Sequence, residues 1–300
     1  FDNLGLVVTD EQHRFGVRQR TTLASKGHNP DVLVMSATPI PRTLALILYG
    51  DLDISIIDEL PPNRKPIETY AVKKGMDQRV NSFIDKNVKE GRQCYIVCPL
   101  VEENEELNLK SVEKLYEEYK TKIFPQYRVS FIHGKMKPKE KDQIMFDFKD
   151  GKIDILISTT VIEVGVNVPN ANLMIIENAE RFGLAQLHQL RGRVGRGEYQ
   201  SYCVLKYQGN TDIIKQRMEV ITKSNDGFVI SEKDLELRGS GEFFGTKQHG
   251  IPEFKIANLF EDMDVLKLVQ SVAMEVLSND PLLEKISRSE ERRVGKECRS

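Results

Sequence analysis

Cysteine is scarce in this 300-residue sequence, which contains only Cys94, Cys98, Cys203 and Cys298. Their spacing fits neither a disulfide framework nor a zinc site, because no second pair of cysteine or histidine residues lies nearby. We therefore interpret all four side chains as ordinary thiols.

Long apolar runs are also missing. No stretch approaches the roughly 20 apolar residues that a helix needs to cross a bilayer, and the N-terminus has no signal-peptide pattern. The sequence therefore favours a cytoplasmic protein without a membrane partner. The formal net charge is only −2, so binding to nucleic acid has to come from a local basic surface rather than from the charge of the whole chain.

One nucleotide-binding signature is absent as well. The sequence contains no G-x-x-x-x-G-K-[ST], the loop whose backbone amides surround the phosphates of a nucleoside triphosphate. Three Gly-Lys pairs occur without the required upstream glycine: Gly134-Lys135, Gly151-Lys152 and Gly295-Lys296. If this chain works on such a nucleotide, we expect the loop to come from elsewhere in a longer protein.

Short apolar segments that alternate with helical ones are present from the first residues. Residues 4–9 are too short for a helix, and their composition is typical of a buried parallel strand. A second strand is expected at 31–35. A helical stretch lies between them at about 15–25, and Pro41 is well placed to begin another helix. This alternation predicts an α/β layer with a parallel sheet.

A stiff polar segment, residues 61–66, interrupts this pattern, since its three prolines fix their own backbone and restrict the residues before them. We place a domain boundary there. A second α/β series follows, with helices expected at about 77–90, 109–121, 138–150 and 184–194. Its expected strands are 67–72, 93–98, 128–132, 153–158, 173–177 and 201–205, a set that is typical of a compact nucleotide-handling domain.

The pattern becomes looser after Tyr207. A helix at 212–224 precedes a glycine-rich segment, and a last helix is expected at about 260–278. Residues 288–300 are dense in charge, so we expect a disordered or non-native tail. The expected domains are therefore 1–62, 63–207, 208–287 and 288–300.

An acidic turn, Asp10-Glu11-Gln12-His13, ends the first expected strand. Carboxylates at the carboxyl edge of a parallel sheet lie where ligands bind in open α/β folds. Hydrolysis of ATP needs one carboxylate that holds Mg²⁺, usually through water, and another that orients and deprotonates the attacking water. Asp10 suits the first role and Glu11 the second. The alternative is a polar turn in which Asp10 caps a helix.

Three arginines lie within six residues in Gln189-Leu190-Arg191-Gly192-Arg193-Val194-Gly195-Arg196. Guanidinium groups stabilise the charge of a phosphoryl group in its transition state. Arg193 and Arg196 are three residues apart, so we expect them to share one helical face and to reach one phosphate. A solvated basic face or an RNA-binding patch is the alternative, but the leucines at 184, 187 and 190 favour a docked helix.

Hydroxyl-bearing residues follow two other expected strands. Ser36-Ala37-Thr38 can hydrogen-bond the acidic turn beside it and so couple nucleotide state to a neighbouring domain. Thr159 and Thr160 are suited to contacting DNA phosphates without reading bases. Gly165 and Asn167 are expected to approach the nucleotide. In both places the alternative is a plain turn after a strand.

Taken together, these segments resemble helicase superfamily 2. The acidic turn matches its motif II, residues 36–38 match motif III, 159–169 match motif V and 189–196 match motif VI. Longer stretches, 10–17, 35–44 and 181–189, are similar to RecG-type helicases in particular, and the resemblance covers nearly everything from residue 1 to about 285.

This resemblance implies two RecA-like motor domains in tandem, the first one truncated in this chain. It also implies a following translocation element made of a helical hairpin and a loop. The implied cofactors are ATP and Mg²⁺. The residues assigned by resemblance are Gln189 and Gly192 at the nucleotide, His13 and Ala37 in coupling, and Arg217, Arg238 and Gln248 in the translocation element. Asn167 departs from the family, which usually has an aspartate there as acceptor for the ribose.

The implied function is ATP-dependent remodelling of branched double-stranded DNA, such as stalled forks and Holliday junctions, in recombination and repair. We expect a wedge domain and the phosphate-binding half of the first motor domain to lie upstream, and the present chain to be inactive alone. A single-stranded DNA-binding protein is a further candidate partner.

Two alternatives remain open at the level of the sequence. The transcription-repair coupling factor, whose partner is RNA polymerase, shares the translocation element, although Gln12-His13 and residues 187–189 favour RecG. A non-catalytic DNA-binding scaffold would explain the missing phosphate loop, but Glu11, Arg193 and Arg196 argue against it.

Overall fold

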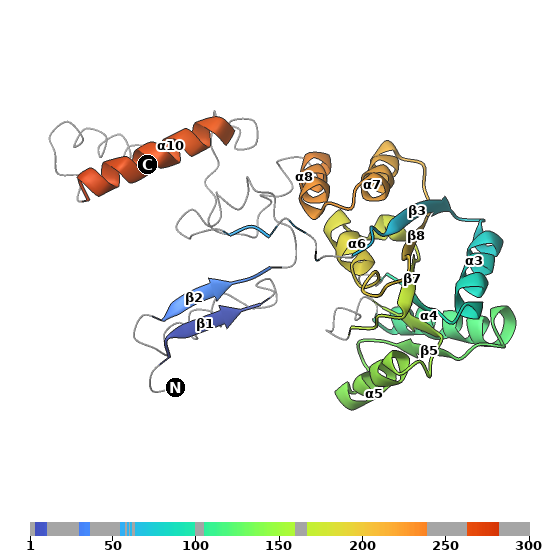
Figure 1. Ribbon diagram of the computed structural model, residues 1–300. Helices are drawn as coiled ribbons and strands as arrows, with labels where there is room; N and C mark the ends of the chain where they lie inside the picture. Colours follow the sequence, from blue (N-terminus) through green and yellow to red (C-terminus); the bar gives the residue numbers. More distant parts are fainter. Residues whose placement is uncertain are drawn as a thin grey trace. The chain divides into compact units, whose positions relative to one another are not determined.

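The computed structural model in Figure 1 describes residues 4–10, 30–36, 55–57, 59, 61, 64–99, 105–159, 167–238 and 263–281. The chain divides into two compact units, one of residues 1–41 with 54–243 and one of residues 42–53 with 244–300. The first unit contains two sheets, and the second contains one described helix.

The smaller sheet consists of two parallel strands, β1 (Leu6–Thr9) and β2 (Asp31–Val34). Both strands were predicted. Asp10 and Ser36 follow them at the same carboxyl edge, because Thr9 pairs with Val34 in the register. The prediction that residues 4–9 form a buried strand is confirmed only at alternate residues of β1. Val7 and Thr9 are buried, whereas Leu6 and Val8 are exposed.

The larger sheet is entirely parallel, with the strand order β3-β8-β7-β4-β6-β5. All six strands of the second predicted series are confirmed. Their bounds are β3 (Glu68–Lys73), β4 (Gln93–Val97), β5 (Val129–Ile132), β6 (Ile155–Ser158), β7 (Ala171–Ile176) and β8 (Tyr202–Tyr207). The central strands β4, β6 and β7 are buried at every position, which explains their nearly continuous apolar sequences.

Helices cover both faces of this sheet (Figure 1). On one face lie α3 (Asp77–Lys89) and α4 (Glu105–Glu118), which continues as a π-helix over Tyr119–Ile123. On the other lie α5 (Pro138–Lys149) and α6 (Leu184–Arg191). Strand β4 shows how one strand serves both cores: Cys94 and Ile96 face one, while Tyr95 and Val97 face the other.

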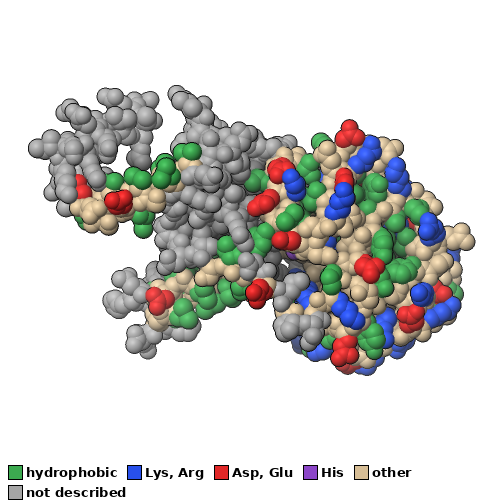
Figure 2. Space-filling model, turned by 45° about the horizontal axis from the view of Figure 1, so that its top comes forward, with side chains coloured by type: hydrophobic (Ala, Val, Ile, Leu, Met, Phe, Trp, Pro, Cys, Tyr) green, Lys and Arg blue, Asp and Glu red, His purple; other side chains and the backbone are tan. Residues whose placement is uncertain are grey.

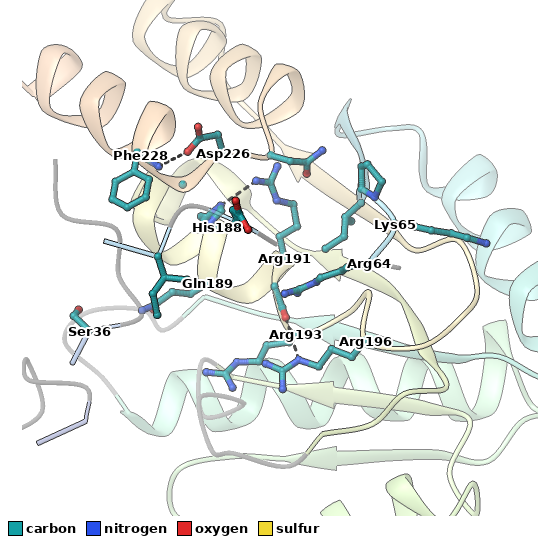
Figure 3. A pocket seen from close by; sticks show the side chains of 17 residues that line it. Ser36, Arg64, Lys65, His188, Gln189, Arg191, Arg193, Arg196, Asp226 and Phe228 are labelled. Atoms are coloured by element: carbon teal, nitrogen blue, oxygen red, sulfur yellow. Dashed lines mark hydrogen bonds between the residues drawn. The ribbon is translucent and has the colours of Figure 1, made fainter. Parts of the chain in front are cut away.

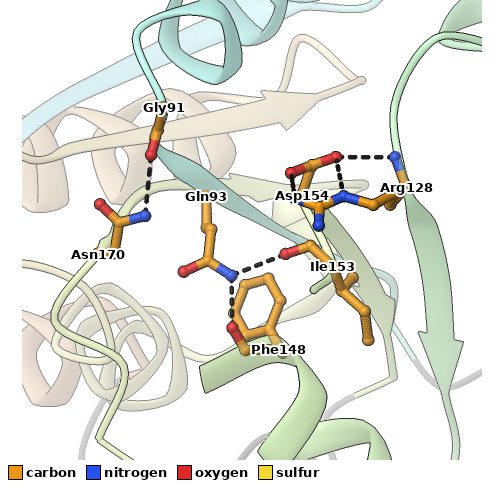
Figure 4. A network of polar contacts seen from close by, with 7 residues as sticks. All are labelled: Gly91, Gln93, Arg128, Phe148, Ile153, Asp154 and Asn170. Carbon is orange, nitrogen blue, oxygen red and sulfur yellow. Dashed lines mark hydrogen bonds and ion pairs between the residues drawn. The ribbon is translucent and has the colours of Figure 1, made fainter. Parts of the chain in front are cut away.

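Polar contacts fix the amino ends of the strands (Figure 4). The side-chain amide of Gln93 donates to the carbonyl oxygens of Phe148 and Ile153, which joins β4 to the end of α5 and the start of β6. Arg128 and Asp154 form a two-point ion pair, with 3.0 Å from Nε to Oδ2 and 2.5 Å from Nη2 to Oδ1. These contacts hold the register of the sheet at the end opposite to the predicted site.

Two further helices, α7 (Asp212–Lys223) and α8 (Gly227–Arg238), form a hairpin after β8. The helix at 212–224 was predicted from its pattern, but α8 was not. Its start carries Asp226-Gly227, a pair that is typical of turns. In the structure Asp226 instead ends the turn before α8, and its Oδ1 accepts from the backbone amide of Phe228 at 2.8 Å.

The second unit contains α10 (Met263–Asn279), which confirms the last predicted helix. No helix in the described part of the chain is both long enough and apolar enough to span a bilayer. The predicted tail, 288–300, lies outside the described residues.

The interpretation of the cysteines as ordinary thiols is confirmed for Cys94, Cys98 and Cys203, which are buried and unbridged. Burial raises the pKa of Cys98 and of Cys203 to about 12. Cys298 lies outside the described residues. No cluster of metal-binding side chains occurs among the residues that the structure describes.

Candidate functional site

Helix α6 is held on the core by three leucines, Leu184, Leu187 and Leu190, which the structure buries. At its start, the side chain of Gln186 accepts from the backbone amide of Gly183 at 3.3 Å, so one of the free amides of the first turn is satisfied. The predicted docked helix is therefore confirmed, but it ends at Arg191 instead of 194.

The chain leaves α6 through a tight turn that two glycines make possible. Gly195 has φ +77°, and an added Cβ would lie 2.9 Å from Cγ1 of Ile67. At Gly197 an added Cβ would lie only 2.3 Å from the carbonyl oxygen of Pro169. Our expectation that Arg193 and Arg196 share a helical face is therefore wrong, because the left-handed backbone at Gly195 separates them.

Arg193 and Arg196 nevertheless lie in one place, because the turn brings both to the wall of the same pocket (Figure 3). Arg196 is exposed and donates from Nε to the carbonyl oxygen of Gly192 at 3.3 Å. Burial raises the pKa of Tyr95 in β4, and the positive charges of Arg193 and Arg196 both oppose that rise. Both guanidinium groups therefore influence the same side chain, the hydroxyl of Tyr95.

The pocket has an excess of positive charge. Among the described residues, its wall carries two carboxylates, Glu59 and Asp226, against five arginine and lysine side chains: Arg64, Lys65, Arg191, Arg193 and Arg196. On the face in Figure 2, by contrast, basic and acidic side chains are interspersed. The positive charge of the pocket is therefore local and does not follow from the net charge of the whole chain.

Arg191 belongs to this wall but points into the protein, where it is only 2% exposed. Its Nη1 donates to the carbonyl oxygen of Ile221 at 2.7 Å and to that of Ser224 at 2.8 Å, at the C-terminal end of α7. The same atom lies 3.4 Å from the hydroxyl of Thr69 in β3. One guanidinium therefore joins α6, α7 and β3, and it neutralises the carbonyl dipoles at the end of α7.

His188 completes this contact, since its Nδ1 lies 3.0 Å from Nη2 of Arg191 (Figure 3). Burial and the charge of Arg191 lower the pKa of His188 to about 4, against a smaller opposite effect of Asp226. The ring is therefore neutral near pH 7. Because a guanidinium can only donate, Nδ1 must accept, and the ring proton resides on Nε2.

A second arginine connects the same region in the opposite direction, from α7 to the residues that precede α6. Arg217 in α7 donates from Nη1 to the carbonyl oxygen of Glu180 at 3.3 Å and from Nη2 to that of Phe182. These two carbonyls precede α6. The helix with the arginine turn and the first helix of the hairpin therefore bind each other through Arg191 in one direction and Arg217 in the other.

The structure describes only some of the remaining predicted site residues. Asp10 and Ser36 lie just after the carboxyl ends of β1 and β2. Thr159 is 2% exposed, and its hydroxyl has no partner among the described residues, whereas Asn167 is exposed. Arg238 ends α8, and its side chain is not described. Outside the described residues lie Glu11, His13, Ala37, Thr38, Thr160, Gly165 and Gln248.

Sequence reasoning assigned no separate role to Arg191, His188 or Arg64. A signal for Arg191 existed, because residues 184, 187 and 191 follow the i, i+3, i+7 spacing of the buried face of α6. A charged side chain at such a position has to find buried acceptors. No comparable signal marked Arg64.

Comparison with known proteins agrees with this geometry. Residues 76–198 match the family model described as the helicase conserved C-terminal domain. A solved structure of the DNA-bound helicase MrfA shares the fold with a TM-score of 0.54, covers 74% of this chain and 34% of that one, and is 17% identical. The six-stranded domain is therefore a RecA-like helicase C-terminal domain.

Residues 224–294 match the model of RecG domain 3, C-terminal. RecG of Bacillus subtilis is 52% identical over 280 residues, which are 93% of this chain and 41% of the relative. RecG of Thermotoga maritima is 51% identical over 92% of this chain and 35% of the relative. A structure of RecG bound to a three-way DNA junction has a TM-score of 0.69 at 48% identity and covers 90% of this chain and 34% of that one.

The chain belongs to the RecG family of ATP-dependent DNA helicases. It corresponds to the C-terminal region of these proteins and spans about two fifths of the curated relatives' length. The match to RecG domain 3 favours this family over the transcription-repair coupling factor.

Replacement of Arg191 by alanine should lower the free energy of unfolding by about 3 kcal/mol, because the carbonyls of Ile221 and Ser224 lose a charged donor inside the protein. Urea titration followed by circular dichroism measures this. The exposed Arg181 serves as the matched control, and its alanine variant should change stability by less than about 0.5 kcal/mol. Equal stability of both variants would contradict the buried network.

His188 should make the protein sensitive to acid. Its pKa is lower in the folded chain than the ordinary 6.5, so its contribution is fully present above about pH 6.5 and is lost as the pH falls through about 4. The unmodified chain should lose about 2–3 kcal/mol more than His188→Asn between about pH 7 and pH 4. Asparagine retains an acceptor near Nδ1 but does not titrate. Parallel pH curves of the two proteins would rule out His188 as the source.

Proposed function

We propose that this chain supplies the second motor domain and the translocation element of an ATP-dependent helicase that remodels branched DNA. The observation that carries the proposal is the convergence of Arg193 and Arg196 on one electropositive pocket beside α6. Permanently charged, planar guanidinium groups suit the triphosphate of a nucleotide, and they stabilise the charge that develops as the terminal phosphoryl group is transferred.

We assign the two cofactors to two groups of side chains, one in the wall of the arginine pocket and one at the edge of the small sheet. Gln189 and Gly192 line the same pocket as Arg193 and Arg196, so this wall can hold phosphate oxygens. Asp10 lies at the carboxyl edge of the small parallel sheet, where a hard oxygen donor is suited to Mg²⁺ through water. When bound, Mg²⁺ would neutralise phosphate charge. In this proposal Glu11 orients and deprotonates the attacking water.

Coupling to DNA is proposed to run through α6 and α7. Because Arg191 and Arg217 bind α6 and α7 to each other, a shift of the arginine turn on nucleotide binding moves the α7–α8 hairpin with it. Ser36, with Ala37, Thr38 and His13, serves coupling on the first motor domain. Thr159, Thr160, Arg238 and Gln248 are assigned to contact or translocate the DNA.

The DNA substrate is proposed from the relatives. A homologous RecG has been solved on a three-way junction, and we assign branched double-stranded DNA to the full protein that contains this chain. A single-stranded DNA-binding protein is a further proposed partner. In this proposal the full protein also contains a wedge domain and the half of the first motor domain that carries the phosphate-binding loop.

The isolated chain should release little or no phosphate from ATP, with or without DNA, since it has no G-x-x-x-x-G-K-[ST] loop. A phosphate-release assay on the purified 300-residue chain measures this, and a full-length RecG protein run beside it is the positive control. Robust turnover by the chain alone would refute the dependence on a loop from elsewhere.

In a full-length protein that contains this chain, Arg196→Ala should lower kcat for ATP by roughly a thousandfold, the scale on which arginine fingers act, while nucleotide binding persists. A steady-state ATPase assay with branched DNA, together with binding of a fluorescent ATP analogue, separates the two effects. Arg181→Ala is the control on an exposed arginine. Unchanged turnover in Arg196→Ala would remove this residue from its proposed role.

A further inference from the structure

Arg64 lies in the extended segment that leads into β3, on a different side of the pocket from α6. Its side chain is partly buried and runs toward the turn that carries Arg193 and Arg196 (Figure 3). Among the residues that the structure describes, its guanidinium forms no hydrogen bond and no ion pair. Because Arg191 faces the interior, Arg64 is the third guanidinium, beside Arg193 and Arg196, that is directed into the pocket.

The position of Arg64 is well fixed, although the segment is not part of a strand. The carbonyl oxygen of Pro66 accepts from the side chain of Gln200 at 2.8 Å, and the amide of Glu68 donates to the carbonyl oxygen of Ser201 at 3.0 Å. Ile67 is buried directly against Gly195. The backbone that carries Arg64 therefore packs on the same turn that aims Arg193 and Arg196.

The neighbouring residue shows that this orientation is specific. Successive side chains of an extended segment point to opposite sides. Lys65 is exposed at the rim of the pocket and extends its ammonium group away from Arg193 and Arg196 (Figure 3). The two adjacent residues carry the same charge, but only Arg64 directs it into the pocket.

Electrostatics agrees with this placement. After burial and Arg191, the charge of Arg64 is a further cause that lowers the pKa of His188 at the pocket wall. Like charges that face one pocket repel each other, and the repulsion is relieved when an anion with several charges binds between them. A nucleotide polyphosphate supplies such an anion.

We propose that Arg64 is a third arginine for the nucleotide, which binds the polyphosphate from the segment preceding β3 while Arg193 and Arg196 bind it from the turn after α6. This inference rests on the proposed function. Arg64 binds phosphate charge in the ground state as well as in the transition state, so its loss should raise KM for ATP more than it lowers kcat.

The test uses steady-state ATPase kinetics of a full-length protein that contains this chain, with branched DNA present. Arg64→Ala should raise KM for ATP about tenfold, the effect of losing one charge-assisted contact at a partly exposed site, with kcat changed less than about threefold. Arg64→Lys, which keeps the charge but loses the two-pronged donor, should fall between. Arg181→Ala, which removes an exposed arginine outside the pocket wall, is the matched control and should match the unmodified protein.

A second measurement guards against a general folding defect. The isolated chain is titrated with inorganic tripolyphosphate and binding is followed by calorimetry, while the thermal midpoint is recorded for each variant. Binding should weaken in Arg64→Ala but not in Arg181→Ala, at equal thermal midpoints. Equal KM and equal tripolyphosphate affinity of the two variants would overturn the inference. So would a raised KM that comes with a lowered thermal midpoint and unchanged tripolyphosphate affinity.

Failure of this inference can be told apart from failure of the proposed function. If Arg196→Ala loses turnover while Arg64→Ala behaves like Arg181→Ala, only the role of Arg64 is wrong. If Arg64→Ala weakens ATP and tripolyphosphate binding while Arg193→Ala and Arg196→Ala keep full turnover, the role of Arg64 is supported and the proposed catalytic arrangement is wrong.

Discussion

The buried guanidinium of Arg191 is the contact on which the arrangement of this region depends. It ends α6, it satisfies two carbonyls at the end of α7, and it approaches β3. A guanidinium cannot lose its charge inside a protein, so it has to keep these acceptors in place. The turn that follows, with Arg193 and Arg196, therefore starts from a fixed point, and so does the hairpin.

The short segment from Arg191 to Arg196 therefore carries side chains that face in two directions. The arginines of the turn face a pocket with excess positive charge, whereas Arg191, only two residues earlier, faces the interior and binds backbone. Arg191 connects the start of this turn directly to the carbonyls at the end of α7. The proposed function depends on such a connection between the arginine pocket and the α7–α8 hairpin.

Much of the fold could be predicted from the sequence, because the strands of the large sheet are buried on both faces and appear as short apolar runs between helices. The end of α6 was predicted too late, since the positive φ of Gly195 is a property of backbone packing against Ile67. The sequence pattern did not predict helix α8, although the resemblance implied a helical hairpin, because Asp226-Gly227 is typical of a turn and here the aspartate caps a helix. The pairing of Arg193 with Arg196 was expected, but the direction of Arg64 depends on how its segment packs on that turn.

The contacts of Arg191 and Arg217 also determine how substitutions in this region would be tolerated. Both arginines donate to main-chain oxygens, so Glu180, Phe182, Ile221 and Ser224 contribute a group that every amino acid possesses. The two donor positions therefore demand one residue type, while the four acceptor positions impose none through this contact. The acceptor residues can therefore be substituted without a compensating change at either arginine. An analysis of co-varying residue pairs would for that reason not detect the contact between α6 and α7.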